Sequence, residues 1–167
     1  MFDNQTIYII LIAIGIAAVM VYFFLDKPKP AIEEKPVSSG SNTLQLQAYE
    51  RLILLVDRIA ISNLISRTPH DGLSARDMQL VLTRNIRDEF DYNITQQIYI
   101  APDAWNAVKN LKEKNLLIIN QVTASLPVDA SALDLQRAIL ENLMSDKNAN
   151  FHELVSEALS FEAKKLL

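Results

Sequence analysis

Three carboxylates stand close together in the middle of the chain, at Asp88, Glu89 and Asp91. A glycosidase uses two such groups in a cleft, where different pKa values let them take different catalytic roles. In this sequence, however, Arg84 and Arg87 alternate with the acids at helical spacing, which is typical of a charged helix face turned to solvent. We therefore interpret the cluster as a solvated surface rather than a catalytic pair.

The two histidines of the chain, His70 and His152, are the next candidates for chemistry. A di-iron bundle requires Glu-x-x-His, and neither histidine has a glutamate three residues before it. His152 and Glu153 begin the zinc motif H-E-x-x-H, but Ser156 occupies the position of the second histidine. The chain has no cysteine, which excludes thiolate nucleophiles and cysteine metal sites. We predict no catalytic residue, no metal site and no cofactor.

Composition narrows the partners further. The glycines are only three, at Gly15, Gly40 and Gly72, and their spacing builds no phosphate-binding loop. The formal net charge is −4. Proteins that bind nucleic acid usually carry a basic stripe, because phosphate contacts supply most of their affinity. This chain shows no such stripe, so we do not expect a nucleic-acid partner.

Two segments set aromatic side chains beside uncharged amides, which either form a buried hydrogen-bond network or line a recognition surface. In the second case Tyr49, Tyr99 and Trp105 are the candidate anchors for a partner. An enzyme of unrecognised type, with a pocket near Glu50, Arg51 and Tyr99, is the alternative.

The N-terminus contains an apolar segment, residues 7–25, with 19 residues and no charge. As a helix it would be roughly 28 Å long, close to the thickness of the hydrocarbon core of a bilayer. A cleaved signal peptide would begin with basic residues, and a buried globular helix would rarely be so apolar. We predict a transmembrane anchor in residues 1–25.

The orientation of this anchor follows from the charges beside it. No basic residue precedes the apolar segment, whereas Lys27, Lys29 and Lys35 follow it. The positive-inside rule then places the N-terminus outside and the rest of the chain in the cytoplasm. The expected location is the inner membrane of a cell, crossed once.

The remainder of the chain divides into a linker and a helical domain. Residues 26–42 contain three prolines and a Ser-Ser-Gly-Ser run, which predict a flexible tether. In residues 43–167 apolar side chains recur at helical spacing in five stretches, which predicts an all-α bundle of four to five helices. The expected helix starts are Thr43, Ser74, Pro102, Ser131 and Asn150.

Several local expectations accompany these helices. The first should run to about Ile61 with residues 52–56 apolar on all sides, and residues 63–72 should be a weakly structured connection. Residues 98–100 favour β structure, but they find no partner strand and are expected to form a buried connection. In the last helix Leu154 and Ala158 are expected to face inward.

The anchor, the stretch Tyr49-Glu50-Arg51-Leu52, and Gln96-Gln97-Ile98-Tyr99 followed by Trp105 together resemble an uncharacterised family of small bacterial proteins. The resemblance implies one membrane helix, a helical cytoplasmic domain and no assigned activity. It supplies no site residues. Taken with the tether, it favours a membrane-tethered interaction or scaffold protein that contacts the bilayer through residues 7–25 and holds a protein partner near the membrane.

Overall fold

The computed structural model describes residues 39–145 and 150–167, and within these two ranges the chain is helical. The only β pairing there is an isolated bridge between Ser74 and Ser131. The prediction of an all-α fold is therefore confirmed. The elements are α2 (Ser39–Ile59), α3 (Ile61–Arg67), α4 (Ala75–Tyr92), the 3-10 helix η1 (Ile94–Ile98), α5 (Pro102–Ser125), α6 (Ala132–Ser145) and α7 (Phe151–Lys164).

The predicted transmembrane segment, residues 7–25, lies outside the described residues, as does most of the predicted linker. None of the helices in the two described ranges combines the length and apolar character needed to cross a bilayer.

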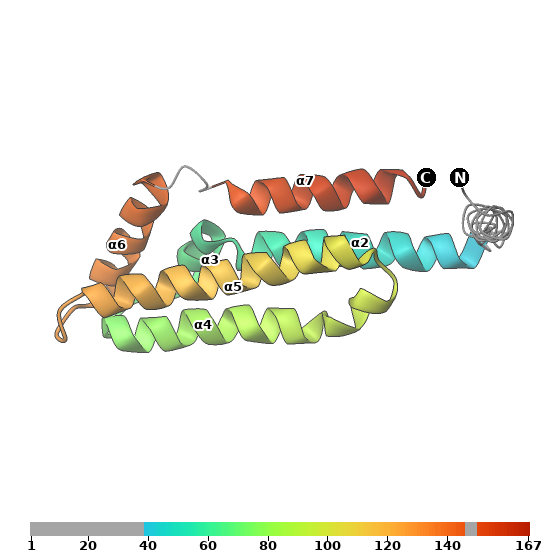
Figure 1. The fold of residues 1–167 in the computed structure, drawn as a ribbon. Coiled ribbons are helices and arrows are strands. Elements are labelled where there is room, and N and C mark those ends of the chain that lie inside the picture. The colour runs from blue at the N-terminus through green and yellow to red at the C-terminus, as the bar shows by residue number, and fades with distance from the viewer. Residues whose placement is uncertain (1–38, 146–149) are drawn as a thin grey trace, which may run out of the picture. The chain divides into compact units, whose positions relative to one another are not determined.

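Four of the helices, α2, α4, α5 and α7, lie alongside one another, while α6 packs against α4 and α5 at one end (Figure 1). Helix α2 contacts α3, α4, α5, α7 and η1, so its predicted place at the centre of the bundle is confirmed. Its buried face contains Leu52 and Leu55, but Leu54 is 63% exposed. The expectation that residues 52–56 are buried on all sides is therefore wrong, because no element covers this side of α2.

All six α-helices of the described ranges contribute to one hydrophobic core, as expected for a bundle that closes on itself. The largest fully buried side chains are Leu52, Leu55, Ile59, Leu64, Met78, Leu82, Ile86, Leu111, Ile119, Leu135, Ile139 and Leu159.

The first helix differs from its predicted bounds at both ends. It begins at Ser39, four residues before the expected cap at Thr43, so the last residues of the predicted linker are helical. It ends at Ile59, where the carbonyl oxygen accepts a hydrogen bond of 2.7 Å from the buried side chain of Asn115. This side chain satisfies a backbone carbonyl at a helix end and so stabilises the break.

Helix α3 occupies the start of the segment for which a weakly structured connection was predicted. Leu64 and Ile65 are buried against the core, which gives this short helix a reason to form that propensity alone does not supply. The chain then turns at Gly72, whose positive φ of 74° favours glycine. The predicted connection is thus wrong for residues 63–67 and correct for the turn that follows.

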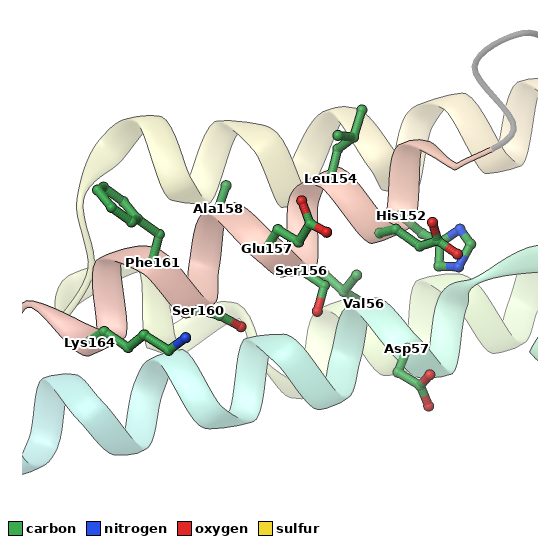
Figure 2. Close-up of a pocket in the computed structure, with 11 residues that line it drawn as sticks. Val56, Asp57, His152, Leu154, Ser156, Glu157, Ala158, Ser160, Phe161 and Lys164 are labelled. Carbon is green, nitrogen blue, oxygen red and sulfur yellow. The ribbon is translucent and has the colours of Figure 1, made fainter.

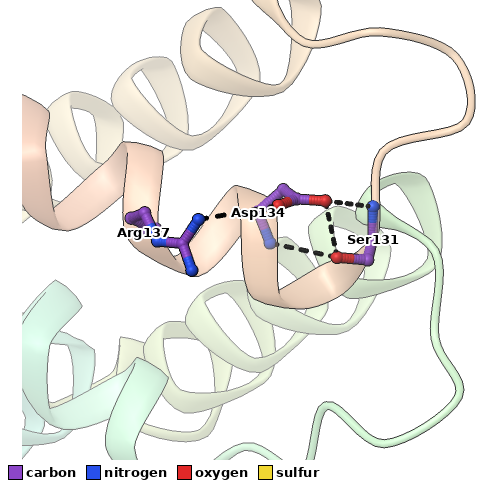
Figure 3. Close-up of polar contacts among 3 residues, drawn as sticks. All are labelled: Ser131, Asp134 and Arg137. Atoms are coloured by element: carbon purple, nitrogen blue, oxygen red, sulfur yellow. Dashed lines mark hydrogen bonds and ion pairs between the residues drawn. The ribbon is translucent and has the colours of Figure 1, made fainter.

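The starts of α4 and α6 are confirmed at the predicted residues. In α4, the hydroxyl of Ser74 donates to Asp77 at 2.6 Å and accepts from its backbone N–H at 3.1 Å. Ser131 and Asp134 repeat this arrangement at 2.7 and 3.2 Å, with Arg137 4.0 Å from the carboxylate (Figure 3). Each pair satisfies backbone donors that a helix start leaves open.

These two helix starts are also joined to each other. The backbone N–H of Ala75 donates to Ala130 at 2.9 Å, and that of Ala132 donates to Leu73 at 3.0 Å. The hydrogen bonds in both capped serines lower the pKa of the carboxylate that receives them, at Asp77 and at Asp134. We call this part of the molecule the capped end.

The segment before α5 contains the remaining departure from expectation. Residues 98–100 form no strand, as predicted, and Ile100 is buried. Ile98, however, is 71% exposed at the end of η1, so the predicted burial is wrong for this residue. Helix α5 then starts at Pro102 as predicted.

Candidate interaction site

The three predicted aromatic anchors lie around the start of α5. Tyr49 is buried, and its hydroxyl oxygen accepts a hydrogen bond of 3.3 Å from the backbone N–H of Ala101. Tyr99 and Trp105 are partly buried and pack against the core. The Trp105 ring lies 5.0 Å from that of Phe90. All three therefore help to hold α2, η1 and α5 together, and their role as partner anchors stays a prediction.

The residues of the alternative enzyme pocket lie on the surface of α2. Glu50 and Arg51 are both exposed, and the Arg51 guanidinium carbon is 5.4 Å from the centre of the Tyr92 ring. The hollows described below lie on other surfaces of the helical unit. The proposed pocket near Glu50, Arg51 and Tyr99 stays a prediction.

The acidic cluster on α4 has a partner that the sequence did not indicate. Glu89 is largely buried and accepts a contact of 2.8 Å from the Nε of Arg58, which comes from α2. Asp88 and Glu89 border a polar hollow of about 570 Å³ together with Arg67 and Tyr92. Because a pair between α2 and α4 links distant residues, helical spacing within α4 could not reveal it.

A larger hollow of about 930 Å³ follows the surface of α7 beside α2 (Figure 2). Ser156 and Ser160 lie on the side of α7 that faces α2, whereas Leu154 and Ala158 lie on the opposite side and are exposed. The predicted inward position of Leu154 and Ala158 is therefore wrong. The core contacts of α7 come instead from Val155, Leu159 and Ala163, which are spaced four residues apart.

The same hollow brings an acid, a histidine and a serine to its edge, at Asp57, His152 and Ser156. A Ser-His-Asp triad requires the carboxylate to hold the histidine. Here Asp57 instead accepts a hydrogen bond of 2.8 Å from the side chain of Asn63. This carboxylate therefore orients the α2–α3 junction.

The most apolar hollow lies where α3, α5, α6 and α7 meet, and we call it the α6–α7 pocket. Its volume is about 410 Å³, within the range of ligand sites. Aliphatic side chains and one aromatic ring form most of its wall, with a few polar groups among them. The lining residues are Ile61, Ser62, Leu111, Lys114, Asn115, Ile118, Leu140, Leu143, Met144, Asn150, Phe151 and His152.

Two side chains define the character of the pocket mouth. Met144 is 88% exposed at the rim, and methionine is common at surfaces that bind apolar partners. Phe151 is covered by Lys114, whose Nζ lies 5.3 Å from the ring centre. This contact places a cation at the edge of an apolar wall.

The apolar rim continues along α6 as a stripe. Leu133, Leu140 and Met144 are all exposed, and their spacing of seven and four residues sets them on one face of the helix. Sequence reasoning missed this stripe, because attention went to the inward residues Leu135 and Ile139. A second set of apolar residues on the same helix was the signal that could have found it.

Comparison with known proteins gives a family but no function. No curated protein and no solved structure matches the chain. One family model matches residues 3–166, which is nearly the whole sequence. This agrees with the predicted resemblance to an uncharacterised family. The chain belongs to DUF7935, a family of unknown function.

Proposed function

We propose that this chain is a membrane-tethered interaction protein whose helical unit holds a partner protein near the cytoplasmic face of the membrane. The observation that carries the proposal is the α6–α7 pocket with the exposed stripe of Leu133, Leu140 and Met144 leading into it. The occupant we expect is a helix of the partner that places an apolar side chain in the pocket and lies along the stripe.

The shape and chemistry of the pocket favour such an occupant. The stripe spans three turns of α6, which is the length over which an amphipathic helix presents anchors at positions i, i+4 and i+7. Apolar rims of this kind gain affinity when a partner removes them from water. Lys114 at the edge would favour a partner with an acidic residue beside its apolar anchor.

The tether supports the same function. Residues 7–25 are uncharged and apolar, and a short linker joins them to α2. Confinement to a thin layer beneath a membrane raises the effective concentration of anything the helical unit binds there. A scaffold depends on this effect, because its output is the local concentration of its partner.

Site-specific crosslinking in cells that naturally express the chain tests the pocket. A photoreactive amino acid at Met144 of the full chain is compared with one at Val128, which is 81% exposed and lies in the loop before α6. We expect a defined protein adduct from position 144 that the substitution Leu140→Asp abolishes. Equal adducts from both positions, or adducts unchanged by Leu140→Asp, would show that the pocket does not hold a protein.

A second comparison tests recruitment itself. Cells receive either the full chain or a chain that lacks residues 1–25, both at native expression level. We expect the shortened chain to remain folded, to crosslink through position 144, and to fail to complement a deletion. Full complementation by the shortened chain would mean that the function is a soluble activity.

A further inference from the structure

Two separated segments of the helical unit contain no charged residue, residues 39–49 and residues 93–102. The first forms the start of α2, and the second contains η1 and the turn into α5. The Asp, Glu, Lys and Arg residues of the chain make up 22% of it, so two uncharged runs of this length stand out among the surface segments.

The fold brings these two uncharged segments together. Helix α2 packs against η1, and the hydrogen bond of 3.3 Å between Tyr49 and Ala101 joins one segment directly to the other. They lie at the end of the helical unit where α2 begins and α7 ends, opposite the capped end (Figure 1). The chain that leads back to the apolar segment leaves from this same end, at Ser39.

Apolar side chains are exposed on this surface. Tyr92 is 74% and Ile98 71% exposed, and Leu44 and Ile94 are exposed as well. The exposed residues between them, such as Thr95 and Gln97, carry hydroxyl or amide groups rather than charges. Charged residues, among them Glu50, Asp91 and Asp103, appear only beyond the ends of the two segments. We call Leu44, Tyr92, Ile94 and Ile98, with the uncharged residues around them, the tether-end surface.

We propose that the tether-end surface rests in the interfacial layer of the bilayer that holds residues 7–25. This proposal rests on the membrane tether of the proposed function and adds an orientation to it. The interfacial layer accepts tyrosine rings, aliphatic side chains and neutral amides, and it penalises charges that lose their water. A surface with exposed isoleucines and without charge matches these requirements.

The length of chain between the anchor and α2 permits this contact. Thirteen residues, 26–38, separate them and can span at most roughly 45 Å when fully extended. Because the contact is intramolecular with respect to the anchor, a small apolar surface is sufficient to populate it. Docking at this end would leave the α6–α7 pocket facing away from the bilayer, open to a cytoplasmic partner.

The test uses the full chain, whose lack of cysteine makes single-cysteine variants straightforward. Ile98→Cys reports on the tether-end surface, and Val128→Cys, of similar exposure at the other end, is the matched control. Each variant carries an environment-sensitive fluorophore and is reconstituted in phosphatidylcholine vesicles, with or without phosphatidylglycerol. Nitroxide-labelled lipids in the vesicles serve as quenchers of fluorophores that reach the interface.

We expect lipid nitroxides to quench the label at position 98 several-fold more strongly than the label at position 128. The effect should be independent of salt and of phosphatidylglycerol, because the surface carries no charge. Equal, weak quenching at both positions would overturn the proposal. Quenching at position 98 that requires phosphatidylglycerol would also overturn it, because lysines such as Lys164 and Lys165 would then make the contact.

Two further readings separate this inference from its alternatives. Shielding of position 98 that rises with the ratio of protein to lipid, without lipid quenching, would assign the surface to contact between copies of the chain. Flotation of the vesicles separates the two levels of the argument. A chain that fails to float with the vesicles contradicts the membrane tether, whereas a chain that floats with a water-exposed label at position 98 contradicts only the docked orientation.

Discussion

The two ends of the helical unit are built by different means. At the capped end, serine and aspartate side chains hold the backbone at the starts of α4 and α6, and two backbone hydrogen bonds join these starts. At the tether end, one long-range hydrogen bond between Tyr49 and Ala101 joins uncharged segments with apolar residues on their surface. The first end uses its polar groups internally, and the second leaves apolar groups facing outward. The difference indicates that the capped end serves stability and the tether end serves contact.

The strongest test of this contrast substitutes one aliphatic residue at each end. Leu135→Ala removes a fully buried side chain of α6 and should lower the free energy of unfolding by about 2–5 kcal/mol. Ile98→Ala removes an exposed side chain at the tether end and should change it by less than about 0.5 kcal/mol. Urea denaturation of the full chain in detergent, followed by circular dichroism, measures both. A large loss from Ile98→Ala would mean that this residue is part of the core.

A smaller effect is expected from the caps. Ser74→Ala and Ser131→Ala each remove a side chain that accepts from a helix N–H, and each should cost about 1 kcal/mol of unfolding free energy. Because the two helix starts are joined, the double variant should lose a different amount from the sum of the single variants. Ser74→Thr keeps the hydroxyl and is the control. Strict additivity in the same denaturation experiment would show that the two caps act independently.

The smallest effect concerns pH. The pKa values of Asp77 and Asp134 lie below the ordinary value of 3.8, mainly because the serine hydroxyl of each cap donates to the carboxylate. Such groups contribute stability that is fully present above pH 3.8 and is lost as the pH falls through the lowered pKa. Wild type should therefore exceed the variant Asp77→Asn with Asp134→Asn in melting temperature at neutral pH. This advantage should shrink below pH 3.8, and an advantage that grows in acid would contradict the cause assigned to the shifts.

Local spacing was sufficient to predict the capped end. Ser-x-x-Asp names both the residue that stops the preceding loop and the group that satisfies it, so Ser74 and Ser131 could be identified without any tertiary information. The end of α2 could not be predicted in this way. Its carbonyl partner, Asn115, lies on α5, and only the packed bundle brings the two together.

The candidate site was only partly predictable for a related reason. Helices α6 and α7 carry apolar residues on more than one face, so periodicity alone cannot decide which set faces the core. The neighbours decide, and they bury Leu135 and Val155 while leaving Met144 and Leu154 outside. The α6–α7 pocket was missed because it is lined by four helices at once.

The bridge between Ser74 and Ser131 has one further consequence. Together with its two flanking backbone hydrogen bonds, it closes the intervening chain, with α4, η1 and α5, into a ring without a covalent crosslink. The ends of this helical hairpin are held side by side, so the hairpin can open and close as one cooperative unit while α2 and α7 remain paired. In such an opening the amide protons of Ala75 and Ala132 lose their protection from solvent exchange in the same event.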